Sequence, residues 1–166
     1  MNFLIFTILG FAGMEAFSYI IHRFLFHGIL WRVHSTHHTP RAFPFELNDF
    51  FSFAFAAVSM YLMIFAERPL MTSIAFPVGF GIALYGVFYF IVHDLFTHRR
   101  FLPFNSKNKL FLTIRAAHQR HHQTAEKKGI EPFGLFVFDY GKFRKKITKR
   151  TETRPSRINL IENEKG

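Results

Sequence analysis

The sequence predicts an all-α, integral membrane helical protein with about three transmembrane spans and a cytoplasmic, histidine-rich cap that holds two metals. Apolar residues make up 49% of the 166-residue chain and include 25 Phe, yet the formal net charge is +10. Apolar and basic residues must therefore be separated along the chain, which is typical of a membrane protein. The ten histidines fall in four short clusters, which indicates the metal-binding cap.

The length predicts a single folding domain. We expect a membrane-embedded domain over residues 1–141 and a basic, loosely ordered tail over residues 142–166. The chain has no cysteine, which excludes disulfides, thiolate nucleophiles, iron–sulfur clusters and thiolate zinc sites. Any metal must be held by nitrogen or oxygen.

The first expected span covers residues 2–21, where Glu15 is the only charged side chain among 20 residues. At ~1.5 Å rise per helical residue, this segment covers the ~30 Å hydrocarbon core of a bilayer. It has no basic residue before the apolar run, unlike a secretory signal, and runs directly into His22 and Arg23. We therefore expect a retained membrane anchor.

The second and third expected spans are the uncharged residues 50–66 and 70–92, which are 17 and 23 residues long. Only Glu67, Arg68 and Pro69 separate them, so they predict a tight transmembrane hairpin. We expect a kink near Pro77.

Charge then predicts the orientation of these spans. Three spans place the segment 21–49 and everything after residue 92 on one side of the membrane. Of the 21 Lys and Arg residues, only Arg68 lies outside those two segments. By the positive-inside rule both segments are cytoplasmic, which predicts the bacterial inner membrane with the histidines on its cytoplasmic side.

The histidines repeat one pair of motifs, H-x4-H followed by H-x2-H-H, before and after the expected hairpin. They are His22 and His27, His34, His37 and His38, then His93 and His98, His118, His121 and His122. Residues i, i+3 and i+4 share one helix face, so we expect each triplet to direct three imidazoles toward a common point. Residues five apart are rotated by roughly 140° on a regular helix, so the second member of each H-x4-H pair should lie past a helix end.

Metal binding explains this clustering better than surface or core positions, because crowded imidazolium groups would repel one another while neutral imidazoles bind a cation. Imidazole alone suits zinc, copper, iron or nickel. Ten imidazoles are too many for one ion but suit two, and neither the H-E-x-x-H zinc-protease signature nor a haem explains them. We predict that all ten ligate two non-haem iron ions, since activated dioxygen beside an apolar cavity can attack an unactivated C–H bond.

The chain resembles the bacterial beta-carotene 3-hydroxylases, within the superfamily of membrane fatty acid hydroxylases and sterol desaturases. The likeness covers roughly residues 10–140 and rests on the four boxes and on five stretches: GME at 13–15, HSTHHTPR at 34–41, FELND at 45–49, YGVFYFIVHDLFTH at 85–98 and AHQRHH at 117–122. The resemblance implies hydroxylation at C3 of each beta-ionone ring, taking beta-carotene through beta-cryptoxanthin to zeaxanthin. It also implies dioxygen as co-substrate and a reduced carrier such as ferredoxin as electron donor. A carotenoid would enter from the membrane lipid, and no nucleic-acid partner is expected.

Four polar residues beside the boxes have expected supporting roles. Glu15 lies two helical turns before His22, and we predict that it bonds to a ligating imidazole. Asp94 follows His93 directly and could orient its ring or only be solvated. For Asn48 and Asp49, just before an apolar span, an N-cap role is the better expectation.

Tyr85 and Tyr89 lie four residues apart on one helix face, where they could line a tunnel for a long polyene or only pack. Three alternatives to carotenoid hydroxylation stay open at this point. They are carotenoid ring ketolation, fatty acid or sterol hydroxylation, and a non-enzymatic membrane protein that holds zinc.

Overall fold

A computed structural model describes residues 2–39, 43, 45–124 and 126–144, so the predicted tail lies outside the described residues from residue 145 onward. The described residues form helices joined by turns and irregular segments, with no strand among them, which confirms the all-α prediction. The elements are α1 (Asn2–Ile20), η1 (Ile21–Phe26), α2 (Trp31–His34), α3 (Asp49–Ile64), α4 (Ala75–Tyr89), η2 (Phe90–Thr97) and α5 (Lys109–His121), where η marks a π-helix.

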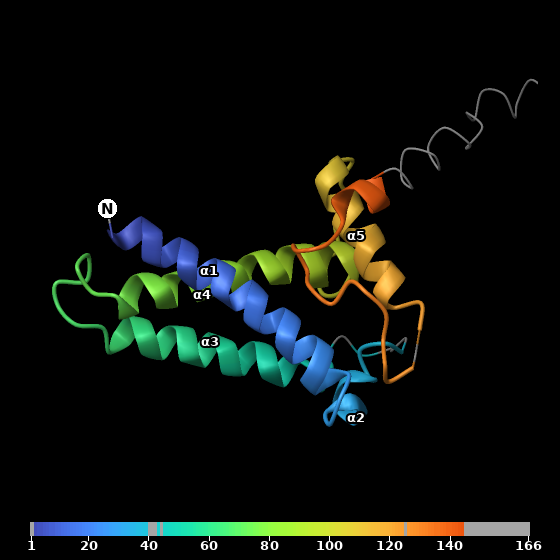
Figure 1. Ribbon diagram of the computed structural model, residues 1–166, viewed down its shortest axis with the longest axis horizontal. Coiled ribbons are helices and arrows are strands. Elements are labelled where there is room, and N and C mark those ends of the chain that lie inside the picture. Colours follow the sequence, from blue (N-terminus) through green and yellow to red (C-terminus); the bar gives the residue numbers. More distant parts are fainter. Residues whose placement is uncertain (1, 40–42, 44, 125, 145–166) are drawn as a thin grey trace, which may run out of the picture.

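Helices α1, α3 and α4 form an elongated bundle, in which α4 packs against both of the others (Figure 1). The crossing of α1 and α4 depends on Gly10 and Gly81, because a Cβ atom at either position would overlap the backbone of the facing helix. On the other side, the Ser59 hydroxyl of α3 donates to the Gly79 carbonyl of α4 at 2.8 Å. Small residues therefore let the three helices approach closely.

Among the described residues, two helices are long and apolar enough to cross a membrane, the 25-residue Asn2–Phe26 and the 23-residue Ala75–Thr97. The second expected span, residues 50–66, corresponds to α3 (Asp49–Ile64), whose 16 residues extend only roughly 24 Å. Its outer surface is nevertheless apolar, with Phe50 70% and Phe53 67% exposed. Exposed apolar side chains on this scale mark a surface that contacts something other than water, and they are consistent with a membrane protein.

The last helix of the bundle begins later than predicted. α4 starts at Ala75, so Pro77 lies in its first turn, where the missing N–H of proline is not needed. The expected kink at Pro77 was therefore wrong: the helical path continues from Ala75 through η2 to Thr97.

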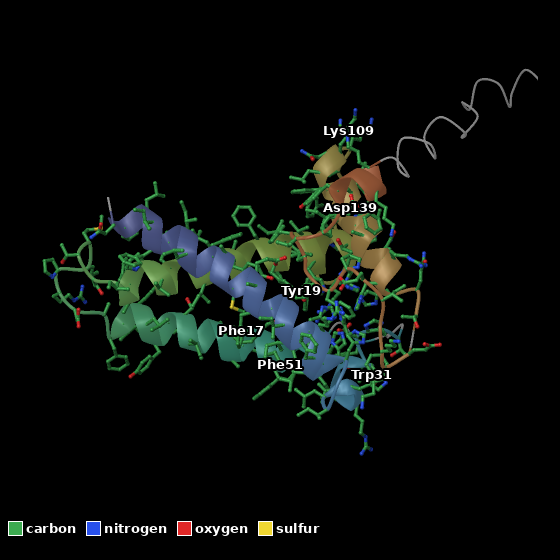
Figure 2. All side chains as sticks on the ribbon, viewed as in Figure 1. Phe17, Tyr19, Trp31, Phe51, Lys109 and Asp139 are labelled. Carbon is green, nitrogen blue, oxygen red and sulfur yellow. The ribbon has the colours of Figure 1, made fainter. Side chains whose placement is uncertain are left out.

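All four histidine motifs lie at one end of this bundle. α1 and α4 run toward that end and α3 runs away from it, and Figure 2 shows the blue side-chain nitrogens gathered there beside α2 and α5. Residues after Thr97 fold over the same end, with a small core of Val92, Ile114 and Leu135. The fold thus closes an apolar bundle with a nitrogen-rich cap.

Candidate metal centre

Nine of the ten histidines form two groups in which the ligand nitrogens all lie within 4.8 Å of one another. The first group contains His22, His27, His34, His38 and His121. The second group contains His37, His93, His98 and His118. The tenth, His122, lies beside the second group, with its ring centroid 4.5 Å from that of His118 and 4.7 Å from that of His98. Its buried Nε2 atom has no hydrogen-bond partner within the described part of the chain.

The H-x2-H-H triplets do not each converge on one point, which corrects the sequence prediction. His34 belongs to the first group and His37 to the second, while His118 belongs to the second and His121 to the first. α2 ends at His34, so His37 lies beyond the helix in a turn. The middle histidine of each triplet therefore crosses to the group built mainly by the other half of the chain.

The H-x4-H pairs are brought together by π-helical turns. In η1 the His27 N–H donates to the His22 carbonyl at 3.0 Å, and in η2 the His98 N–H donates to the His93 carbonyl at 2.9 Å. A π-helix closes its hydrogen bonds between residues five apart, so each pair lies one turn apart on the same face. His27 and His98 do follow the last residue of their helices, as predicted, but the widened turn was not foreseen. The repeated x4 spacing was the signal for it.

In the first group, every Nδ1 atom faces a neutral oxygen. The acceptors are the carbonyls of Phe133, Lys127, Thr124 and Ile130 for His22, His27, His38 and His121, and the side-chain oxygen of Asn48 for His34. With Nδ1 donating, each Nε2 carries a lone pair. The Nε2 atoms of His22 and His34 nevertheless lie 3.0 Å apart, and those of His27 and His121 lie 3.1 Å apart. Facing lone pairs repel unless a cation attracts both, so this group fits a metal ion.

In the second group, two Nδ1 atoms face carboxylates instead. His37 Nδ1 donates to Glu46 Oε2 at 2.7 Å, and His93 Nδ1 donates to Asp94 Oδ1 at 2.9 Å. The Nε2 atoms of His98 and His118 lie 2.8 Å apart, which again fits a cation between them. The contact expected of Asp94 is thus made. Glu46 was missed, although it lies in the FELND stretch that supported the resemblance.

Burial, together with the neighbouring histidines, lowers the pKa of His34 and of His121 to about 3 and the pKa of His38 to about 4, so these three imidazoles are neutral at pH 7. In the second group, burial and the surrounding histidines hold the pKa of His37 and of His118 well below its usual value. Metal ions bind the neutral form of histidine, so the electrostatics agree with the geometry.

Glu15 does not contact a histidine, which corrects the second expectation for this site. Its Oε1 accepts the backbone N–H groups of Phe136 and Val137, both at 2.9 Å, and its Oε2 accepts the Tyr85 hydroxyl at 2.9 Å. A carboxylate buried in the bundle is thus used to hold the segment 133–138 against α1. That segment also supplies the Phe133 carbonyl to His22, so the effect of Glu15 on the site is indirect.

The expected N-cap role of Asn48 was also wrong. Asn48 precedes α3, but its side chain makes no capping bond and accepts from His34 Nδ1 at 3.1 Å. The Asp49 carboxylate accepts the Glu46 N–H at 2.9 Å and the Arg100 guanidinium. Both residues therefore support the histidine groups rather than the helix end. Sequence spacing alone could not distinguish these roles.

An apolar cavity of about 470 Å³ lies between α1, α3 and α4 and leads to the histidines. Tyr85 and Tyr89 line it, as do Asn48 and Asp94 at its histidine end. A space of about 30 Å³ among the histidines shares Tyr89 with this cavity, and the Tyr89 hydroxyl lies 3.1 Å from His93 Nε2. A long apolar molecule in the bundle could therefore reach both groups.

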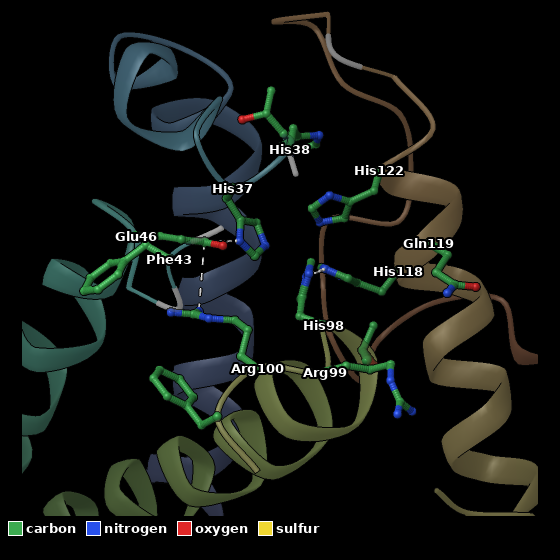
Figure 3. Close-up of a pocket in the computed structure, with 13 residues that line it drawn as sticks. His37, His38, Phe43, Glu46, His98, Arg99, Arg100, His118, Gln119 and His122 are labelled. Carbon is green, nitrogen blue, oxygen red and sulfur yellow. Dashed lines mark hydrogen bonds and ion pairs between the residues drawn. The ribbon is translucent and has the colours of Figure 1, made fainter. Parts of the chain in front are cut away.

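A polar pocket of about 530 Å³ opens on the outer side of the histidines. Figure 3 shows His37, His98, His118 and His122 along its wall, with Glu46 and Arg100 to the left of them. Both cavities reach the second group, since His37 lines this pocket and also the space that adjoins the apolar cavity. The histidine groups thus lie between an apolar cavity and a polar one.

Comparison with known proteins agrees with this geometry. The family model described as fatty acid hydroxylase matches residues 7–142. A beta-carotene hydroxylase of Pseudescherichia vulneris is 36% identical over 134 residues, which cover 78% of this chain and 73% of that protein. The beta-carotene hydroxylase of Pantoea ananas is 35% identical over 125 residues, which cover 74% and 70%.

Plant proteins match as well. A chloroplastic beta-carotene 3-hydroxylase of an Oncidium hybrid cultivar is 42% identical over 135 residues, which cover 76% of this chain but 42% of the plant protein. The chain thus spans about two fifths of the length of that relative. No solved structure gives a significant match. The histidine motifs, the helical bundle and these relatives together establish that the chain belongs to the fatty acid hydroxylase family.

Proposed function

We propose that this chain is a non-haem di-iron monooxygenase that hydroxylates beta-carotene at ring carbon C3, through beta-cryptoxanthin to zeaxanthin. One observation carries the proposal: two groups of inward-facing histidine nitrogens lie at the end of an apolar cavity within the helical bundle. The bacterial relatives, named beta-carotene hydroxylase, support the choice of substrate.

All ten histidines hold the two metals, five around each position, with His122 as the fifth ligand of the second group. The duplicated motif supports this role for His122, since it occupies the place that His38 has in the first group. Two iron ions held there would supply the activation of dioxygen that side chains cannot provide. Zinc fits the same nitrogens but has no redox chemistry, so it could not support hydroxylation.

The chain itself positions the substrate and excludes water. The apolar cavity takes up the polyene along the bundle, so one ring reaches the space among the histidines. Phe26 packs in a stacked arrangement on His34, 5.1 Å between centroids, and keeps one side of that space apolar. Tyr89 borders it on the other side, with its hydroxyl beside His93. These contacts hold the ring near the metals while its polyene stays in the bundle.

We further propose that α3 completes a third span and that the cap is cytoplasmic, at the bacterial inner membrane. Among the described Lys and Arg residues, Arg68 alone lies at the end of the bundle opposite the histidines, which supports this orientation. The substrate then enters from lipid, while a reduced ferredoxin or similar donor approaches the polar pocket from water. The basic surface of the cap would attract an acidic donor.

The test is expression in a bacterium that already makes beta-carotene, followed by chromatography of its pigments beside a His37→Ala control. We expect zeaxanthin and beta-cryptoxanthin from the unchanged chain only. Ring ketones would assign ketolation instead. Unchanged beta-carotene from well-expressed protein would refute the substrate, and bound zinc without oxygen-dependent turnover would indicate a non-enzymatic metal-binding protein.

A further inference from the structure

Arg100 lies at the centre of a buried cluster of carboxylates beneath the second histidine group. Its side chain is only 8% exposed. Nη1 donates to Asp94 Oδ1 at 3.0 Å and lies 3.9 Å from Glu46 Oε2, while Nη2 donates to Asp49 Oδ2 at 2.5 Å. Figure 3 shows Arg100, which also lines the polar pocket, reaching toward Glu46. One guanidinium thus joins three carboxylates that come from two distant parts of the chain.

The backbone fixes the position of Arg100. Its N–H donates to the Asp94 carbonyl at 2.9 Å, directly after η2 ends. The residues on both sides, Arg99 and Phe101, have φ angles of 58° and 49°, in the left-handed region that side chains other than glycine rarely adopt. Such strain persists only where surrounding contacts over-determine the conformation. The surrounding contacts therefore hold this turn in the backbone conformation that places the Arg100 side chain beside the second histidine group.

Two of the three carboxylates contact the second group directly. Glu46 Oε2 accepts from His37 Nδ1, and Asp94 Oδ1 accepts from His93 Nδ1. Arg100 bonds to the same Asp94 oxygen and lies near the same Glu46 oxygen, so it fixes the atoms that orient the two rings. The first group contacts only neutral oxygens through its Nδ1 atoms, although it contains more histidines.

The carboxylate partners of His37 and His93 affect how the second group binds a metal. A carboxylate that accepts from Nδ1 makes the imidazole a stronger electron donor through Nε2, and loss of such a partner typically weakens metal binding 10–100-fold. One guanidinium among three carboxylates also leaves an excess of negative charge beside the second group. That charge favours a cation there and, for a redox metal, its more oxidised form.

We propose that Arg100 is a positioning residue that sets Glu46 and Asp94 against His37 and His93, and so strengthens metal binding at the second group alone. The proposal rests on the di-metal centre proposed above and extends it. The two metal positions are then chemically unequal, although their histidine motifs are duplicated.

The test is titration of the full-length, metal-stripped protein in detergent with Co²⁺, followed by its absorption and by competition with a coloured chelator. His27→Ala and His98→Ala first identify the signals of the first and second positions. Arg100→Gln, Glu46→Gln and Asp94→Asn should then each weaken the second position by about 10–100-fold and leave the first within about twofold. Arg100→Lys should weaken the second position less than Arg100→Gln does. Lysine keeps the positive charge but lacks the planar guanidinium that bonds to several carboxylates at once.

Two matched variants complete the design. Arg99→Gln removes the same charge one residue away, but this side chain is exposed and bonds to Asn105, so both affinities should be unchanged. Asn48→Asp places a carboxylate beside His34 and should tighten the first position only. If Arg100→Gln does not fold, the smaller changes at Glu46 and Asp94 give the answer.

The proposal is overturned if those variants weaken both positions equally or weaken neither. Binding of two ions by a wild-type protein that makes no hydroxylated carotenoid would refute the proposed function and leave this inference intact. A wild-type protein that binds fewer than two ions would refute the di-metal centre itself, and this inference with it.

Discussion

The two histidine groups have the same design and different surroundings. Each uses an H-x4-H pair within a π-helical turn and one histidine contributed by the opposite half of the chain. The first group is oriented by backbone carbonyls between residues 124 and 133 and by Asn48, whereas the second is oriented by Glu46 and Asp94. A duplicated motif therefore supplied similar ligands twice, and parts of the chain outside the motif made the two positions different.

The exchange of histidines has a further consequence. His37 from the first half completes the second group, and His121 from the second half completes the first. Each histidine group, as the structure has it, therefore contains residues from both halves of the chain. We therefore expect the two positions to form together when the cap closes over the bundle.

The largest expected effect comes from removing one neighbouring histidine or the other. His37→Ala should remove the ion of the second group and His38→Ala the ion of the first, so each variant should retain about one metal ion in place of two. Product in the carotenoid-making bacterium should fall at least ~100-fold in both, because the chemistry needs both ions. Metal-to-protein ratios by mass spectrometry and pigment chromatography measure the two effects.

Double variants test whether the assignment of groups is correct. His37→Ala combined with His98→Ala affects one group only and should still retain one ion. His37→Ala combined with His27→Ala affects both groups and should retain none. If the two pairs bind equal amounts of metal, the division into two groups is wrong.

A second prediction changes the substrate cavity without touching either group. Ala56 and Ala57 of α3 are both exposed, but Ala56 lines the apolar cavity and Ala57 does not. Ala56→Phe should lower hydroxylated product by about 10-fold or more with both metals retained, because the added ring fills space needed by the polyene. Ala57→Phe is the matched control and should have little effect. Equal losses from both variants would mean that this cavity does not bind the substrate.

The smallest expected effect comes from weakening the contacts of Glu15, which hold the segment beside the first histidine group. Glu15→Gln weakens the carboxylate that holds the backbone of Phe136 and Val137, and a buried hydrogen bond left unmade costs ~1–3 kcal/mol. We expect a lower unfolding temperature in detergent and weaker binding of the first-group ion, since Phe133 in the same segment holds His22.

Glu131→Gln is the control for that change. Glu131 pairs with Arg23 at the surface, where its side chain is 55% exposed, and such pairs contribute ~0–1 kcal/mol. Its loss should therefore be nearly neutral. If Glu131→Gln destabilises the protein as much as Glu15→Gln does, the segment is held by its surface pair rather than by the buried carboxylate.

Much of the fold could be predicted from sequence. The apolar runs predicted the bundle helices, because helix length and hydropathy are local properties. The helix boundaries were predicted less accurately. Pro77 does not break α4, since this helix begins only two residues before it. That the segment 50–66 spans the membrane stays a prediction, because α3 is shorter than the apolar run that indicated it.

The ten histidines were identifiable as candidate metal ligands from their clustering and duplication. Their Nδ1 partners were not, because four of them are backbone carbonyls, which carry no residue signature. Glu46 and Arg100 were missed for a different reason. Neither carries a metal-binding spacing of its own, and their contacts with the second group exist only once the chain segments meet.

The sequence by itself determined the chemical types present: which helices are apolar, which nitrogens can bind metal and that the binding motif occurs twice. Only the tertiary structure decided which histidine joins which group and which of them contact carboxylates. The physical reason is distance along the chain. His37 and His98 are 61 positions apart in the numbering, yet their ring centroids lie 4.3 Å apart. Spacing rules describe one helix, whereas each metal position is assembled from segments that only the packing of the bundle and cap brings together.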